Sequence, residues 1–219
     1  MARLVIFGAG DIARLAHRYF TSDSPHDVVG FVTDREHRQG ETFLGLPWID
    51  VEQLSTRFPP SEHEAFVAIS YAKMNRVRAG KYAFMREAGY RLATYISSHC
   101  TYLADAAPGD NCLILEDNTI QPFATIGNNV TLWSGNHIGH DSRIGDHCFI
   151  SSHVVISGHV TVGAYSFIGV NATLRNSITI GDATLIGAGS VVMKDTRPRS
   201  VYVPDRTKVF SKTSDAVDL

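Results

Sequence analysis

The chain lacks the features that mark several large classes of protein. Its 219 residues carry a formal net charge of −2, which argues against a surface for nucleic acid or for an anionic membrane. It has no run of about 18 or more apolar residues, so we expect no membrane span. The first apolar run, residues 4–7, is too short for a signal peptide.

Cysteine is also scarce. The three cysteines, Cys100, Cys112 and Cys148, show no CxxC spacing. We expect Cys112 and Cys148 to be buried core thiols, because both occupy a small-residue position of the repeat described below. These observations predict a reduced, cytoplasmic setting.

What the sequence does contain is a repeat of six residues from Ile114 to Val192. Every sixth residue is Ile, Leu or Val without a slip, the next residue is often Gly, and the residue two places earlier is mostly small. A period of six fits neither an α-helix nor an alternating strand. It is the hexapeptide pattern of a parallel β-helix.

The period predicts the geometry of the coil. Three hexapeptides close a triangle of eighteen residues, with the aliphatic side chain toward the axis and the small residue in the corner. Glycine suits backbone that turns sharply or approaches a neighbour closely. Residues eighteen apart stack, and about five stacked coils form one continuous core.

The first hundred residues have a different pattern. Apolar runs alternate with helical segments, which predicts a small parallel α/β sheet. We expect strands over residues 4–7, 28–33, 65–70 and 90–96, helices over 11–19 and 73–87, and a short helix within 48–58. The domain prediction is a Rossmann-like domain over 1–98, a β-helix over 99–192 and a tail over 193–219.

The turn after the first strand reads G-x-G-x-x-A, with Gly8 and Gly10 at the end of a strand and Ala13 in the following helix. Such a turn lets a phosphate approach backbone N–H groups at a helix N-terminus, and Asp34 after the second strand could hold a ribose hydroxyl. The motif alone is weak evidence. It leaves a mononucleotide or nucleotide-sugar site, an NAD site and a purely structural turn open.

Histidines are dense in the β-helix and suggest either a metal site or a general base. His147, His153 and His159 are six apart, so they occupy three different sides of the coil. His140 and His159 are nineteen apart and could be neighbours on adjacent coils. A metal site assembled between subunits stays open.

His140 is the sharper candidate for a base. It lies next to a corner and is followed by Asp141, whose carboxylate could fold back to fix the tautomer of the imidazole. His137 is the rival, and spacing alone does not separate the two histidines.

Five features of the sequence form one recognisable set: the glycine turn at 8–10, Asp34-Arg35, Ile69-Ser70, the repeat array, and the closing residues 186–192. In these features the chain resembles the hexapeptide-repeat acyltransferases of the sialic-acid O-acetyltransferase type, which include nucleotide-aminosugar N-acetyltransferases. The resemblance implies a left-handed β-helix, a homotrimer, and acetyl-CoA in the groove between adjacent β-helices. It also implies a nucleotide-linked sugar held by the N-terminal domain, and no metal.

The resemblance also implies roles for particular residues. His140 with Asp141, ahead of Ile144-Gly145-Asp146, matches the catalytic pair of the family. A second histidine that some members use at the acetyl-CoA site is replaced here by Phe149, so His147 or His153 could take its place. The implied nucleotide-sugar residues are Gly8, Ala9, Gly10, Asp34, Arg35 and Ser70, and the implied coenzyme A residues are Val170 and Ala188.

The function predicted from this resemblance is acetyl-CoA-dependent N-acetylation of a nucleotide-linked amino sugar for bacterial surface glycan synthesis, with His140 as general base in direct attack. The partners are the two substrates and two further copies of the chain, without nucleic acid or membrane. The alternatives are sugar O-acetylation, a β-helix metal site and a trimeric scaffold without activity.

Overall fold

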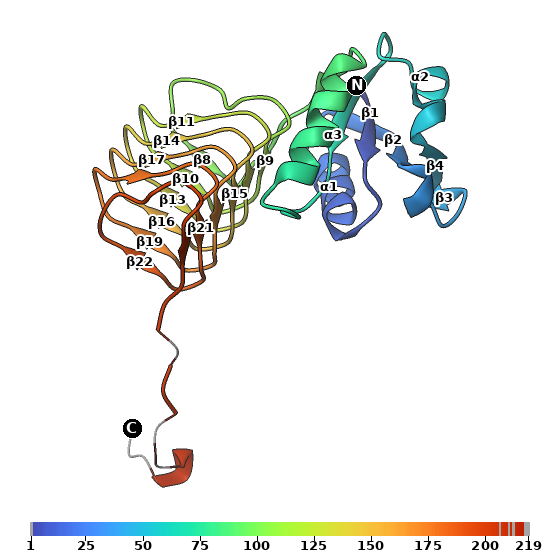
Figure 1. Ribbon diagram of the computed structural model, residues 1–219. Coiled ribbons are helices and arrows are strands. Elements are labelled where there is room, and N and C mark those ends of the chain that lie inside the picture. The colour runs from blue at the N-terminus through green and yellow to red at the C-terminus, as the bar shows by residue number, and fades with distance from the viewer. Residues whose placement is uncertain (1, 206, 210, 212, 217–219) are drawn as a thin grey trace.

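Figure 1 shows the computed structural model, in which an α/β domain lies beside a stack of flat coils. The structure describes residues 2–205, 207–209, 211 and 213–216. Part of the tail predicted over 193–219 therefore lies outside the described residues. None of the described helices is long and apolar enough to cross a membrane.

The α/β domain is built on one six-stranded sheet with the order β3-β4-β2-β1-β5-β6. All its pairings are parallel except that of β3 with β4, which confirms the predicted parallel α/β sheet. The strands are β1 (Ala2–Phe7), β2 (His26–Thr33), β3 (Thr42–Phe43), β4 (Leu46–Asp50), β5 (His63–Val67) and β6 (Arg91–Leu92). The helices are α1 (Asp11–Ser22), α2 (Leu54–Arg57) and α3 (Arg76–Glu87), with 3-10 turns η1 (Arg35–His37) and η2 (Val51–Gln53).

Two stretches differ from the sequence prediction. The segment expected to hold only a short helix begins as strand β4, because Trp48 and Ile49 are buried and pair with Phe31 and Val32 of β2. The strand expected over 90–96 is divided between two sheets. Its first part, β6, pairs with β5, whereas β7 (Tyr95–Ile96) pairs with a strand of the β-helix.

The β-helix is triangular and left-handed, as predicted, and each of its three faces is a parallel sheet of two-residue strands. The first face holds β7, β9 (Leu113–Ile114), β12 (Thr131–Leu132), β15 (Phe149–Ile150), β18 (Phe167–Ile168), β21 (Leu185–Ile186) and β23 (Val201–Tyr202). The second holds β8 (Thr101–Tyr102), β10 (Thr119–Ile120), β13 (His137–Ile138), β16 (Val155–Ile156), β19 (Thr173–Leu174) and β22 (Val191–Val192). The third holds β11 (Thr125–Ile126), β14 (Arg143–Ile144), β17 (Thr161–Val162) and β20 (Thr179–Ile180).

The register of the faces is the predicted eighteen residues. Ile120 pairs with Ile138 and Ile138 with Ile156, so the aliphatic residues form ladders along the axis. They pack into one core together with the small residues that precede them, such as Cys112 and Cys148, both fully buried. Burial raises the pKa of both thiols to about 12, which fits core residues rather than nucleophiles.

Of the two uses expected of glycine in the repeat, the structure shows the close approach. The glycines that follow aliphatic residues do not turn the chain. They allow close approach, since a Cβ on Gly139 would lie 2.5 Å from backbone atoms of Ser157 and Gly158 in the next coil. The turn comes two residues later, where one residue per hexapeptide adopts left-handed backbone, as Asp141 does with φ 58°.

The four residues that connect two faces are called an edge here. The first edge joins the first and second faces, the second edge joins the second and third faces, and the third edge joins the third and first faces. Their left-handed residues are Asp117, Gly135, His153, Asn171 and Gly189 on the first edge, Phe123, Asp141, His159 and Ser177 on the second, and Asn111, Asn129, His147, Tyr165 and Ala183 on the third.

The α/β domain packs side chains against the first face of the β-helix and binds backbone carbonyl groups of the third edge. The buried guanidinium of Arg78 in α3 donates hydrogen bonds to the carbonyl oxygens of Asn129, His147 and Cys148, at 3.0 to 3.3 Å. The side chain of Asn75 donates to the carbonyls of Tyr165 and Ser166 in the same way. The carbonyls of the third edge thus hold helix α3 in place.

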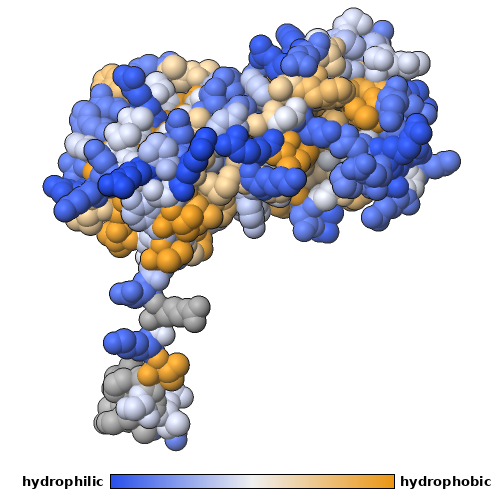
Figure 2. Space-filling view, viewed as in Figure 1, coloured by the Kyte–Doolittle hydropathy of each residue, from blue (hydrophilic) through white to orange (hydrophobic). Residues whose placement is uncertain are grey.

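The far end of the β-helix is open to solvent. Apolar side chains gather there, close to the point where the tail leaves (Figure 2), and Val191, Met193 and Val201 are more than half exposed. Strand β23 is the last to join a face, pairing with β21 after the six-residue period has ended at Val192.

Candidate active site

On the second edge of the β-helix, histidine and aspartate side chains lie close enough together to act as one site. Ile138 points into the core and Gly139 passes close to the next coil, which leaves His140 and Asp141 at the corner. The left-handed backbone of Asp141 turns its side chain toward the preceding residue, and Asp141 Oδ2 lies 2.9 Å from His140 Nδ1. A carboxylate on Nδ1–H directs the free lone pair of the imidazole to Nε2, where it can accept a proton.

Two further groups hold His140 from neighbouring coils. The backbone N–H of His140 donates to Gln121 Oε1 at 2.9 Å. On the other side the imidazole lies against Gly158, where a Cβ would come within 2.6 Å of His140 Nε2. Glycine at position 158 therefore makes the space that the ring occupies, and the sequence reasoning did not single it out.

His159 completes the group, as its spacing of nineteen from His140 suggested. The two rings are perpendicular, with centroids 4.9 Å apart, and His159 Nε2 lies 3.9 Å from Asp141 Oδ2. About half of each of the three side chains is exposed. By contrast, the rival base His137 makes no side-chain hydrogen bond among the described residues, and its side chain is on the outer side of the second face.

A second site lies in the α/β domain, at the carboxyl ends of β1, β2 and β5. It is a cavity of about 750 Å³ that reaches the β-helix at Trp133. Five of the six residues predicted for the nucleotide sugar line it, namely Gly8, Ala9, Gly10, Asp34 and Ser70. The expected position, the crevice at the carboxyl ends of parallel strands, is where this class of sheet binds ligands.

Arg35 is the exception among the predicted residues. It does not line the cavity, although its neighbours Asp34 and Glu36 do, and its Nε lies 3.7 Å from Asp50 Oδ2 instead. The sequence reasoning also missed Lys81 of α3, whose Nζ donates to Asp34 Oδ1 at 2.6 Å inside the cavity. Asp34 and Lys81 are 47 positions apart, so only the fold brings them together.

The predicted coenzyme A residues lie on the first edge. Val170 and Ala188 are exposed on adjacent coils, joined by the hydrogen bond from Gly189 N to Val170 O at 2.8 Å. His153 is exposed on the same edge one coil earlier, whereas His147 is packed on the third edge between Tyr82 and Tyr165. His147 and His153 were the two candidates for the histidine that Phe149 replaces. Only His153 lies on the same edge as Val170.

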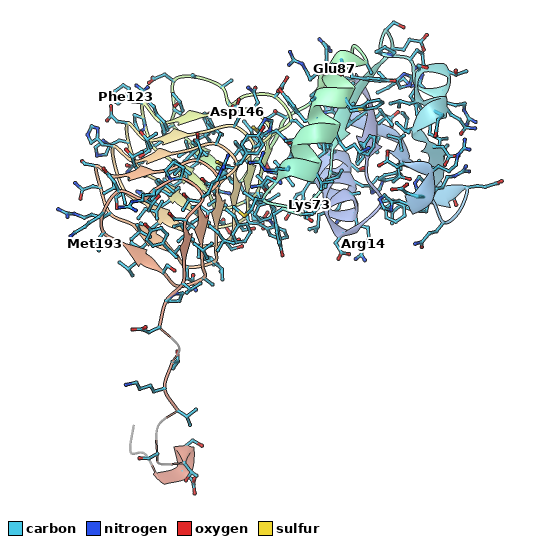
Figure 3. All side chains as sticks on the ribbon, viewed as in Figure 1. Arg14, Lys73, Glu87, Phe123, Asp146 and Met193 are labelled. Carbon is cyan, nitrogen blue, oxygen red and sulfur yellow. The ribbon has the colours of Figure 1, made fainter. Side chains whose placement is uncertain are left out.

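The His140 group and the cavity of the α/β domain lie on different sides of the β-helix. Figure 3 labels Phe123, which is on the second edge, at the side of the coils remote from the α/β domain, and Asp146 of the third edge beside α3. His140 shares the edge of Phe123. Within one chain, therefore, His140 does not face the cavity of the α/β domain.

Comparison with known proteins supports the same architecture. Residues 123–158 match the family model described as bacterial transferase hexapeptide (six repeats). No curated protein matches the chain closely enough to serve as a relative.

Several solved structures are similar over almost the whole chain. PerB from Caulobacter crescentus, in complex with CoA and GDP-perosamine, is 24% identical, with 92% of this chain and 93% of that chain covered and a TM-score of 0.79. The acetyltransferase domain of PglB from Neisseria gonorrhoeae is 21% identical, with 92% and 96% covered and a TM-score of 0.77. WeeI from Acinetobacter baumannii is 18% identical, with 92% and 96% covered and a TM-score of 0.77. The chain therefore shares the fold of these three solved structures, and its β-helix carries the repeat of the matched family model.

Proposed function

We propose that the chain transfers the acetyl group of acetyl-CoA to the amine of a nucleotide-linked sugar, with His140 as the general base. The observation that carries the proposal is the hydrogen bond between Asp141 Oδ2 and His140 Nδ1, which leaves His140 Nε2 free to accept a proton. The similar fold of PerB in complex with CoA and GDP-perosamine supports the reaction class.

In the proposed reaction the sugar amine attacks the thioester carbonyl while His140 Nε2 takes a proton from the nitrogen. The carbonyl oxygen becomes negative in the tetrahedral intermediate and is stabilised by a backbone N–H near the corner. The C–S bond then breaks, and the proton returns from His140 to the departing thiolate. The products are the N-acetyl sugar and coenzyme A with a free thiol, and no acyl-enzyme is required.

The proposal includes a homotrimer. His140 is on the edge remote from its own nucleotide cavity, while Val170 and Ala188 are on the first edge. A second copy placed along the β-helix could bring its first edge and its cavity to the His140 edge of the first copy. Acetyl-CoA would then lie in the groove between two chains, and three such contacts would close a ring.

The nucleotide part of the substrate is assigned to the cavity at the glycine turn. Gly8 and Gly10 leave backbone N–H groups at the start of α1 accessible to a phosphate, and Lys81 adds a cation beside them. Arg35 does not line the cavity, so we assign the cationic contact with the nucleotide sugar to Lys81. Lys81→Ala should raise KM for the nucleotide sugar about tenfold with kcat retained, the size of one charged hydrogen bond in a partly exposed site. Arg35→Ala is the control and should leave KM unchanged.

The reaction class is tested by thiol release from acetyl-CoA with UDP-, dTDP- and GDP-linked 4-amino sugars and with the matching hydroxyl sugars. Release with one amino sugar alone supports N-acetylation and identifies the nucleotide. Release only with a hydroxyl sugar would replace N-acetylation by O-acetylation. No release with any acceptor would contradict the proposal and favour a scaffold.

A further inference from the structure

His140, Asp141 and His159 present three ligand atoms to one point on the second edge. One atom from each side chain can be chosen so that all lie within 4.8 Å of one another. Asp141 Oδ2 is in the middle, 2.9 Å from His140 Nδ1 and 3.9 Å from His159 Nε2. Two ligands on one tetrahedral zinc, each bound at about 2.1 Å, lie roughly 3.4 Å apart, and the two observed distances bracket that value.

We propose that this group binds a divalent transition-metal ion of the Zn²⁺ type and that the bound ion switches the base off. Two imidazoles and one carboxylate are the donor set that zinc takes at sites with an open fourth position. The single carboxylate offsets part of the charge of the ion. The coils are already joined here by the hydrogen bond from His159 N to His140 O at 2.9 Å, so the ligands need little rearrangement.

The proposed inhibition follows from the two nitrogens of His140. In the active arrangement Nδ1 carries the hydrogen and donates it to Asp141, so Nε2 has the free lone pair. A metal ion bound through Nδ1 and Oδ2 replaces that hydrogen bond. The neutral imidazole must then carry its one hydrogen on Nε2, where it can no longer accept a proton. The ion thus needs no contact with either substrate to stop the reaction.

Metal binding is tested on the purified full chain without substrates, so it does not depend on the proposed reaction. Co²⁺ serves as the probe because its visible absorption reports four-coordinate nitrogen and oxygen ligands, and Zn²⁺ should displace it. We expect one Co²⁺ per chain. His159→Gln should weaken binding at least tenfold, because it removes one ligand. His153→Gln is the matched control and should keep the Co²⁺ spectrum, since His153 has the same position in the repeat on the first edge.

Inhibition is tested by thiol release at increasing Zn²⁺. We expect kcat to fall with occupancy while KM stays constant, and a chelator to restore turnover. The rate of His159→Gln, taken relative to its own metal-free rate, should fall only at Zn²⁺ concentrations at least tenfold higher than for the native chain. Equal inhibition of His159→Gln would show that zinc acts elsewhere and would overturn the switch. Absence of the Co²⁺ spectrum in the native chain would overturn the site itself, whatever the activity.

Discussion

The second and third edges of the β-helix have the same backbone conformation, but their side chains have different surroundings. His159 and His147 occupy equivalent positions of the repeat, with φ 59° and 63°. His147 is packed between tyrosines and accepts a hydrogen bond from Asn129 at 2.9 Å, next to the carbonyls that hold Arg78. His159 is half exposed beside His140 and Asp141.

The comparison separates two kinds of information. The hexapeptide repeat determines on which edge of the β-helix each histidine lies and which backbone angles it adopts. What covers the edge then determines what the histidine can do, because a covered imidazole packs and an uncovered one can meet a substrate. We therefore expect substitutions on the third edge to change stability and substitutions on the second edge to change turnover.

The largest effect should come from removing the base. His140→Ala should lower kcat by about 10²–10⁴-fold, the usual contribution of a general base, and should leave substrate binding and melting temperature nearly unchanged. His147→Ala on the third edge should do the reverse, with turnover retained and stability lowered by roughly 0.5–3 kcal/mol. Steady-state kinetics and thermal melting of both variants test whether the second edge affects turnover and the third edge affects stability. Comparable loss of turnover in His147→Ala would contradict it.

Next in size is the loss of Arg78. Burial lowers the pKa of its guanidinium to about 10, yet the group stays charged at neutral pH and serves three carbonyls of the third edge. Arg78→Ala leaves those carbonyls without a charged donor, and we expect the free energy of unfolding to fall by about 3 kcal/mol. Denaturant unfolding at fixed protein concentration measures it. Arg14→Ala is the control. It removes a mostly exposed ion pair with Asp11 and should lower the free energy of unfolding by less than about 1 kcal/mol. A cost equal to that of Arg78→Ala would count against the importance of the buried contact.

Arg78 also marks the limit of what the sequence could predict. The period of six determined the faces, the inward ladders and the stacking of His140 near His159, because each depends on local spacing. The contacts of Arg78 with positions 129, 147 and 148, and of Lys81 with Asp34, join distant segments that no pattern connects. Strand β4 was missed because its pairing with β2, rather than its local sequence, makes it a strand.

A smaller effect is expected from substitution of Gly158, which lies on the second edge against the His140 ring. A Cβ at this position would lie 2.6 Å from His140 Nε2 and 2.8 Å from Cε1, so the ring must move. Gly158→Ala should lower kcat roughly 10- to 100-fold with KM retained, since a displacement of about 1 Å can cost 10²-fold. Gly80→Ala is the control, because a Cβ there meets nothing within 4 Å. A fall in melting temperature without a fall in kcat would make Gly158 structural only.

The smallest effect is the contribution of His147 on the third edge to the pH dependence of stability. Burial lowers the pKa of His147, with the nearby Arg78 acting in the same direction against the carboxylates of Asp146 and Asp110. The unfolded chain therefore binds a proton at this histidine at a higher pH than the folded chain does. The stability contributed by neutral His147 is complete above its unfolded pKa of about 6.5 and is lost as the pH falls toward the lowered folded value.

The slope is limited to about 1.4 kcal/mol per pH unit for one proton. His147→Gln keeps an oxygen that can accept the hydrogen bond of Asn129 but cannot titrate, so its unfolding free energy should fall less between about pH 7.5 and 5.5 than that of the native chain. Denaturant unfolding of both proteins across this range isolates the contribution of His147, because the other histidines are common to both. Identical slopes would mean that His147 binds its proton equally well when the α/β domain covers the third edge, and burial would then not be what distinguishes this edge from the second.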